Sequence, residues 1–279
     1  MSWRDVIRKL VSEDIGVKDI TTHALIPRDE EIKAEVVAKE SGVCAGIDEA
    51  AYLFRYYGLK VNDKLVNEGN EVEANKVLME VSGSTRRLLE VERVAIGLIQ
   101  RMSGIATMTR KAIKIARENN KKVRIAATRK TVLGYVDQKA VQIGGGDPGR
   151  WRLDDCVLIR RNHVRIIGSI SEAVELVKKA VSYTKKIEVE ANNAQDVLEA
   201  AKAGADVIMM DNMKQDEIGK GLQLLKENNL RDKVLVDVAG GITLESLKEY
   251  AKHDIDIISM GCLTHSVKAL DVNLRILGV

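Results

Sequence analysis

The chain has 279 residues, 45% of them hydrophobic and 30% charged, which is typical of a folded protein with one large domain or two medium ones. Its 44 basic residues nearly balance its 41 acidic residues, so the net charge gives no reason to expect a nucleic-acid or membrane-surface partner. No segment approaches the roughly 18 uninterrupted apolar residues of a membrane span, and the three separated cysteines match neither a disulfide framework nor a zinc site, so we expect a cytoplasmic protein.

The first hundred residues predict a mixed α/β domain. An amphipathic helix is expected over 1–14, and the alternating stretch EIKAEVVAKE (31–40) predicts a half-buried strand. A second helix is expected over 45–58, where Gly58 ends it. Short strands separated by tight turns are expected over 63–83.

A long helical pattern occupies residues 84–120. Its apolar side chains recur at helical spacing and include Leu88, Leu89, Val91, Val94, Ala95, Leu98 and Ile99. The pair Ser103-Gly104 lies in the middle of this pattern. Because both residues are weak helix formers, we expect the pattern to break there into two helices.

From Val123 onward, short apolar runs alternate with amphipathic helical patterns. The runs are VRIAAT, CVLIRR, KIEVEA, DVIMMDN, VLVDVAGG and DIISMG. This alternation indicates a parallel sheet, and six such runs predict a barrel. In β/α barrels the chemistry gathers at the carboxyl ends of the strands. The residues at these ends are Arg129, Lys130, Arg160, Arg161, Glu190, Asp211, Asn212, Gly240, Gly241 and Gly261.

The segment GGGDPGRWRLDDCVLIRRNHV combines glycines with many arginines. Glycine lets backbone amides approach an anion closely. Arginine offers a planar fork that pairs with a carboxylate or a phosphate through two hydrogen bonds. Three glycines, Gly144 to Gly146, precede Arg150 and Arg160. This composition favours an anionic ligand with several charged groups.

The chain resembles the quinolinate phosphoribosyltransferase family almost from end to end. The resemblance is carried by SEDIGVKDITT, KESGVCAG, LLEVERVAIGLIQRMSGIAT, TRKT, AVQIGGGDPGRWRLDDCVLIRRNHV, IEVEANN, IMMDNM, VAGGI and SMGCLTHSVKALDV. It implies an α/β protein of the type II phosphoribosyltransferase class. An open-faced α/β sandwich would occupy 1–107 and an incomplete parallel α/β barrel 108–265, with 266–279 returning to the sandwich. It also implies a homodimer with shared active sites, or a higher oligomer built from it.

The resemblance further implies a reaction and a role for each site residue. Quinolinate would react with phosphoribosyl pyrophosphate, giving nicotinate mononucleotide, pyrophosphate and carbon dioxide in NAD biosynthesis, with Mg²⁺ as cofactor. The implied catalytic residues are Lys130, which would meet the pyrophosphate, and Glu190 and Asp211, which would hold Mg²⁺ and the ribose hydroxyls. The implied substrate-binding residues are Arg129, Arg150 and Arg160 for the dicarboxylate, Arg93 from the partner subunit, and Gly240, Gly241 and Gly261 for the 5′-phosphate.

Three features of the implied acid pocket depart from the family pattern, and one of them is the segment after Thr131, which is shorter and lacks the family's proline. Gly149 stands where the family has histidine, and Arg160 stands where it has lysine. Three hypotheses therefore stay open: an active quinolinate phosphoribosyltransferase, a phosphoribosyltransferase for another aromatic acid, and a non-catalytic homologue that binds nucleotides or a partner. Retention of Lys130, Glu190 and Asp211 speaks against the third hypothesis.

Overall fold

Two kinds of sheet, one antiparallel and one parallel, organise the chain. The computed structural model describes residues 2–28 and 30–278. The chain divides into two units, of which the first comprises residues 1–110, 133–145 and 267–279 and the second comprises residues 111–132 and 146–266. The expected α/β class, with a small sandwich-like unit and a parallel-sheet unit, is confirmed.

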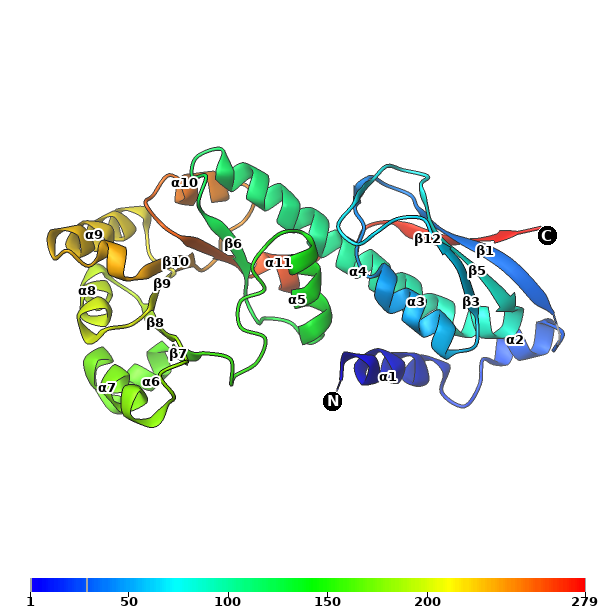
Figure 1. Ribbon diagram of the computed structural model, residues 1–279, viewed down its shortest axis with the longest axis horizontal. Coiled ribbons are helices and arrows are strands. Elements are labelled where there is room, and N and C mark those ends of the chain that lie inside the picture. Colours follow the sequence, from blue (N-terminus) through cyan, green and yellow to red (C-terminus); the bar gives the residue numbers. More distant parts are fainter. Residues whose placement is uncertain (1, 29, 279) are drawn as a thin grey trace. The chain divides into compact units, whose positions relative to one another are not determined.

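The first unit is built on an antiparallel sheet with the strand order β12-β1-β5-β3 (Figure 1). Its strands are β1 (Glu31–Ala38), β3 (Lys60–Lys64), β5 (Val77–Ser84) and β12 (Val272–Leu277), and a separate short ribbon joins β2 (Gly42–Val43) to β4 (Glu71–Val72). The helices of this unit are α1 (Trp3–Ile15), α2 (Ile20–Leu25), α3 (Ile47–Tyr56), α5 (Gly134–Ile143) and most of α4 (Thr85–Arg117). The strand expected over 31–40 and the helix expected over 45–58 are both present.

The predicted break in the long helical pattern is wrong, because α4 continues through Ser103 and Gly104. The buried Ser103 hydroxyl donates to the Ala45 carbonyl oxygen (3.0 Å) and accepts from the Ala45 backbone N–H (2.9 Å). A side chain at Gly104 would lie 2.2 Å from the Lys268 carbonyl oxygen. The two small residues therefore allow other backbone segments to pack against an uninterrupted helix. Within the described residues, neither α4 nor any other helix is long and apolar enough to cross a membrane.

Residues 133–145 belong to the first unit, whereas the sequence placed them in the barrel domain over 108–265. Helix α5 lies in this segment, and two ion pairs connect it to other parts of the first unit. Arg101 pairs with the fully buried Asp137 (2.7 Å), and Lys139 pairs with the fully buried Glu49 (2.6 Å). Buried carboxylates need such partners. The first pair joins α5 to α4, and the second joins α5 to α3.

The second unit contains six parallel strands in the order β6-β11-β10-β9-β8-β7 (Figure 1). They are β6 (Arg124–Ala127), β7 (Val157–Ile159), β8 (Ile187–Ala191), β9 (Val207–Asp211), β10 (Leu235–Ala239) and β11 (Ile257–Met260). Each coincides with one of the six predicted apolar runs. Because β6 and β7 are the two edges of the sheet, the barrel is incomplete, as expected.

Helices follow these strands, and capping side chains or a glycine mark the ends of some of them. They are α6 (Arg161–Ile167), α7 (Ile170–Ala180), α8 (Ala194–Ala203), α9 (Gln215–Glu227), α10 (Leu247–Ala251) and α11 (Cys262–His265), with a 3₁₀ turn over Arg231–Lys233. The Ser169 and Asn193 side chains accept backbone N–H bonds at the starts of α7 and α8. Gly204, with φ +84°, ends α8 in the left-handed region that glycine favours.

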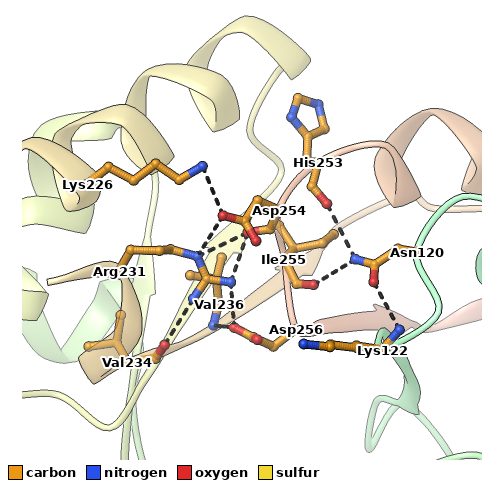
Figure 2. A network of polar contacts seen from close by, with 10 residues as sticks. All are labelled: Asn120, Lys122, Lys226, Arg231, Val234, Val236, His253, Asp254, Ile255 and Asp256. Carbon is orange, nitrogen blue, oxygen red and sulfur yellow. Dashed lines mark hydrogen bonds and ion pairs between the residues drawn. The ribbon is translucent and has the colours of Figure 1, made fainter.

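A network of polar contacts joins the amino ends of β6, β10 and β11 (Figure 2). The Arg231 side chain is only 11% exposed, and its guanidinium donates to the Asp254 carbonyl oxygen (2.9 Å) and to the Asp256 carboxylate (2.9 Å). That carboxylate also accepts from the Val236 backbone N–H, and Asn120 donates to the Ile255 carbonyl oxygen. These bonds satisfy strand-end backbone groups at the edge of the sheet opposite the carboxyl ends. This network lies at the end of the sheet opposite the predicted site residues.

Candidate active site

Most of the predicted site residues follow the carboxyl ends of the six parallel strands. In the order of the sheet, Arg129 and Lys130 follow β6, Gly261 follows β11, Gly240 and Gly241 follow β10, Asp211 ends β9, Glu190 lies near the end of β8 and Arg160 follows β7. Carboxyl ends of parallel strands meet at one edge of a sheet, so these residues lie along one edge of the second unit. Arg93 is an exposed residue of α4 in the first unit.

A cavity of about 710 Å³ opens beside β8 and β9, and it is lined by Glu190 and Asp211, the two acids predicted to bind Mg²⁺. Its wall is polar and comes from the ends of these strands and from α6, α7 and α8. The lining residues are Arg161, Val164, Arg165, Gly168, Ser169, Ile170, Glu190, Asn192, Asn193, Asp196, Glu199, Asp211 and Asn212. The structure thus brings Glu190 and Asp211 together in one solvent-accessible site.

Strand alternation aims Glu190 away from the buried face of β8. Residues Ile187, Val189 and Ala191 are buried, whereas Glu188 and Glu190 are half-buried. The shared face of the two glutamates, predicted from the stretch IEVEA, is confirmed. The Glu190 Oε2 accepts the Arg161 backbone N–H (3.0 Å), which orients the carboxylate without neutralising it.

The Asp211 carboxylate is oriented by its neighbour Asn212. The Asn212 side-chain amide donates to Asp211 Oδ2 (2.9 Å), and the Asn212 backbone N–H donates to the Ala239 carbonyl oxygen (2.9 Å). Asn212 has φ +55°, a left-handed conformation that is uncommon outside glycine and clusters at functional sites. Gly240 lies against it with φ +102°, and a Cβ there would come within 2.4 Å of the Asn212 Oδ1.

Two further acids lie on strands of this sheet, the half-buried Glu188 on β8 and the buried Asp237 on β10. Burial first and the nearby Asp237 carboxylate second raise the pKa of Glu188 to about 7, against the opposing effect of Arg150. Burial also raises the pKa of Asp237 to about 6, against the hydrogen bond donated by the Ser259 hydroxyl (2.7 Å). Glu188 and Asp237 would therefore bind protons more readily than ordinary carboxylates, so that less negative charge accumulates near Glu190.

Neither of these two acids was predicted as a site residue. The alternation within IEVEA contains the signal for Glu188, because it places this side chain on the face of Glu190. The signal for Asp237 is that it is the one acid within the apolar run VLVDVAGG. Only the packing of β10 between β9 and β11 brings it beside Ser259.

The basic residues predicted to bind anions come from three loops. Arg129 and Lys130 are exposed after β6, where the Thr264 hydroxyl donates toward the carbonyl oxygens of Thr128 (3.2 Å) and Lys130 (3.4 Å). Arg150 lies close enough to Glu188 to lower its pKa. Arg160 is exposed immediately before α6, and its backbone N–H donates to His163 Nδ1 (3.0 Å). Hydrogen bonds to backbone groups thus hold the loops that carry Arg129, Lys130 and Arg160.

Comparison with known proteins assigns the family. The model of the quinolinate phosphoribosyl transferase C-terminal domain matches residues 105–275, and that of the N-terminal domain matches residues 19–103. The chain belongs to the quinolinate phosphoribosyltransferase family. Its resemblance to that family, proposed from the sequence motifs, is thereby confirmed.

Relatives of this quinolinate phosphoribosyltransferase family member match along nearly the full chain. A probable nicotinate-nucleotide pyrophosphorylase [carboxylating] of Methanocaldococcus jannaschii is 44% identical over 275 residues, covering 97% of this chain and 96% of the relative. The human nicotinate-nucleotide pyrophosphorylase [carboxylating] is 35% identical over 246 residues, covering 88% and 82%. The crystal structure of the Ehrlichia chaffeensis nicotinate-nucleotide pyrophosphorylase superposes with a TM-score of 0.91 at 31% identity and covers 99% of both chains.

Proposed function

We propose that this chain transfers the phosphoribosyl group of phosphoribosyl pyrophosphate to quinolinate with decarboxylation. The products are nicotinate mononucleotide, pyrophosphate and carbon dioxide, and the reaction belongs to NAD biosynthesis. Membership of the family, shown by matches along nearly the whole chain, supports this function. The observation that carries it is the single cavity lined by both Glu190 and Asp211 at the carboxyl ends of neighbouring strands.

Glu190 and Asp211 suit Mg²⁺ as the cofactor. Their carboxylate oxygens are hard ligands, and Mg²⁺ commonly uses one or two carboxylates together with water and substrate phosphates. Within the described residues, no cluster of three or more acidic, histidine or cysteine side chains could hold a metal alone. A site completed by substrate oxygens therefore fits this chain. When bound, the ion would offset negative charge on the departing pyrophosphate.

The protein's own residues mainly bind and orient the two substrates. The bond from ribose C1 to pyrophosphate breaks, and the quinolinate nitrogen supplies the electron pair of the new bond, so no protein nucleophile is required. Lys130 would bind the pyrophosphate as negative charge develops on it. The positive ring nitrogen then stabilises the electron pair left at C2 when carbon dioxide departs, and a proton completes nicotinate mononucleotide.

The remaining anionic groups match the other predicted residues. Arg129, Arg150 and Arg160 would bind the two carboxylates of quinolinate through bidentate pairs. Gly240 and Gly241 have positive φ values of +102° and +63°, and together with Gly261 they would offer backbone N–H groups to the 5′-phosphate. Glu190 and Asp211 would also bind the ribose hydroxyls.

The acceptor is tested by comparing two acids. The purified protein with Mg²⁺ and phosphoribosyl pyrophosphate should release pyrophosphate and carbon dioxide in equal amounts when quinolinate is added, and not when nicotinate replaces it. The dicarboxylate is expected to be preferred because three arginines serve the acid pocket. Because Gly149 and Arg160 depart from the family pattern, another aromatic acid is the second candidate. Turnover with nicotinate but not with quinolinate would establish that alternative.

We also propose a homodimer in which Arg93 completes the partner's active site. Arg93→Ala and Arg160→Ala should each be nearly inactive alone. After subunit exchange in an equal mixture, about one quarter of the wild-type activity should return, because half of the dimers would then have one site with both arginines. A mixture of Arg129→Ala with Arg160→Ala is the control, since both residues lie in the second unit and no hybrid site regains both. Exchange verified by mass without recovered activity would refute the shared site.

A further inference from the structure

Two arginines of α6 line the same cavity as the proposed metal acids. Arg161 and Arg165 are four residues apart, one turn of the helix, and so lie on the same side of it. Both residues are exposed, and neither guanidinium makes an ion pair with any residue that the structure describes. The cavity thus contains two unneutralised cationic side chains beside Glu190 and Asp211.

The other acids of the cavity are already engaged by backbone groups. The Glu199 Oε1 accepts the Ser171 backbone N–H and hydroxyl, both at 2.9 Å, at the start of α7. The Asp196 Oδ2 accepts the Asn192 backbone N–H (3.0 Å) at the start of α8. These two carboxylates stabilise helix starts, and neither forms an ion pair with Arg161 or Arg165.

The position of Arg161 is linked directly to that of Glu190. The backbone N–H of Arg161 donates to Glu190 Oε2, so the turn from β7 into α6 lies against the end of β8. The Arg161 side chain therefore starts next to the Glu190 carboxylate, because its own backbone nitrogen donates to that group. A ligand held by Glu190 through a cation would place its negative oxygens within reach of this arginine.

We infer that Arg161 and Arg165 bind the diphosphate of phosphoribosyl pyrophosphate, an inference that rests on the proposed function. A magnesium diphosphate presents both signs of charge, with the cation suited to Glu190 and Asp211 and the phosphate oxygens suited to two guanidiniums. Each guanidinium can donate two parallel hydrogen bonds to a phosphate group. The two arginines would thus stabilise the negative charge that grows on the leaving group.

Three variants test this assignment. Arg161→Gln, Arg165→Gln and the double variant remove the charges from the cavity and keep polar side chains. Arg152→Gln is the matched control, because Arg152 is an exposed arginine outside the cavity, 3.7 Å from Asp154. Calorimetric titrations with Mg²⁺ present should use pyrophosphate, phosphoribosyl pyrophosphate, ribose 5-phosphate and quinolinate in separate experiments.

Each single variant should weaken pyrophosphate and phosphoribosyl pyrophosphate binding by about fivefold or more, and the double variant by about thirtyfold or more. Ribose 5-phosphate and quinolinate should bind each variant within twofold of the wild type, and so should every ligand to Arg152→Gln. If ribose 5-phosphate binding weakened as much as pyrophosphate binding, the arginines would be assigned to the 5′-phosphate, and the inference would be overturned. Unchanged pyrophosphate binding in the double variant would also overturn it. A wild type that binds magnesium pyrophosphate but does not turn over quinolinate would refute the proposed function alone.

Discussion

Glu190→Gln and Asp211→Asn are each expected to lower kcat by about a thousandfold, equivalent to about 4 kcal/mol of transition-state stabilisation. Each substitution keeps the size and the hydrogen-bonding oxygen of the side chain and removes its charge. The proposed magnesium site has only these two protein carboxylates, so the loss of one leaves the charge of the departing pyrophosphate poorly offset. Binding of Mn²⁺, used as a spectroscopic substitute for Mg²⁺, should weaken in parallel when pyrophosphate is present.

The folded state should tolerate both changes. Neither carboxylate forms an ion pair with any residue that the structure describes, and each accepts a hydrogen bond that the amide oxygen can retain. Melting temperatures of the ligand-free variants are therefore expected to lie within about 3 °C of the wild type. Glu199→Gln is the control, because Glu199 lines the same cavity but serves the start of α7, and its turnover should change less than about threefold. A large drop in melting temperature with retained Mn²⁺ binding would identify the acids as structural instead.

Gly240→Ala is expected to lower the free energy of unfolding by about 2 kcal/mol or more and to remove most of the activity. The added Cβ would lie 2.4 Å from Asn212 Oδ1 and 2.7 Å from the Asn212 backbone nitrogen. The φ of +102° is also unfavourable for alanine. Relief of this contact must displace Asn212, which in turn releases the hydrogen bond that orients Asp211.

Gly219→Ala, in the same unit, is expected to raise the free energy of unfolding instead of lowering it. Gly219 lies inside α9, its backbone is helical, and a Cβ there meets no atom within 4 Å. Alanine should stabilise the helix by up to about 1 kcal/mol and leave turnover unchanged. Chemical denaturation measures both free energies. If Gly240→Ala matched the wild type in stability and in turnover, the close approach of Asn212 to Gly240 would not be needed for the site.

Much of the second unit could be predicted because its signals are local. Each of the six strands is a short apolar run between helical patterns, and period-two alternation alone places Glu188 and Glu190 on one face. The parallel arrangement then requires residues such as Glu190 and Asp211 to meet at one edge of the sheet. The motifs around Lys130 and the glycine pair identified the family, and the family models confirmed it.

The features that remained unpredicted depend on contacts between segments far apart in the sequence. In the sequence Ser103 and Gly104 resemble a helix break. In the structure they are small because the backbone at Ala45 and Lys268 packs against them. Residues 133–145 belong to the first unit, where Asp137 pairs with Arg101 and Lys139 pairs with Glu49, two contacts between residues far apart in the sequence.

The sequence by itself determined the family, the six strands and the acids at their ends, because these follow from local periodicity and from motif order. Only the tertiary structure decided that Glu190 and Asp211 line one cavity and that Arg161 and Arg165 share it. The physical reason is that hydrogen bonds and close packing between strands set side-chain directions, which the local spacing of residues does not specify.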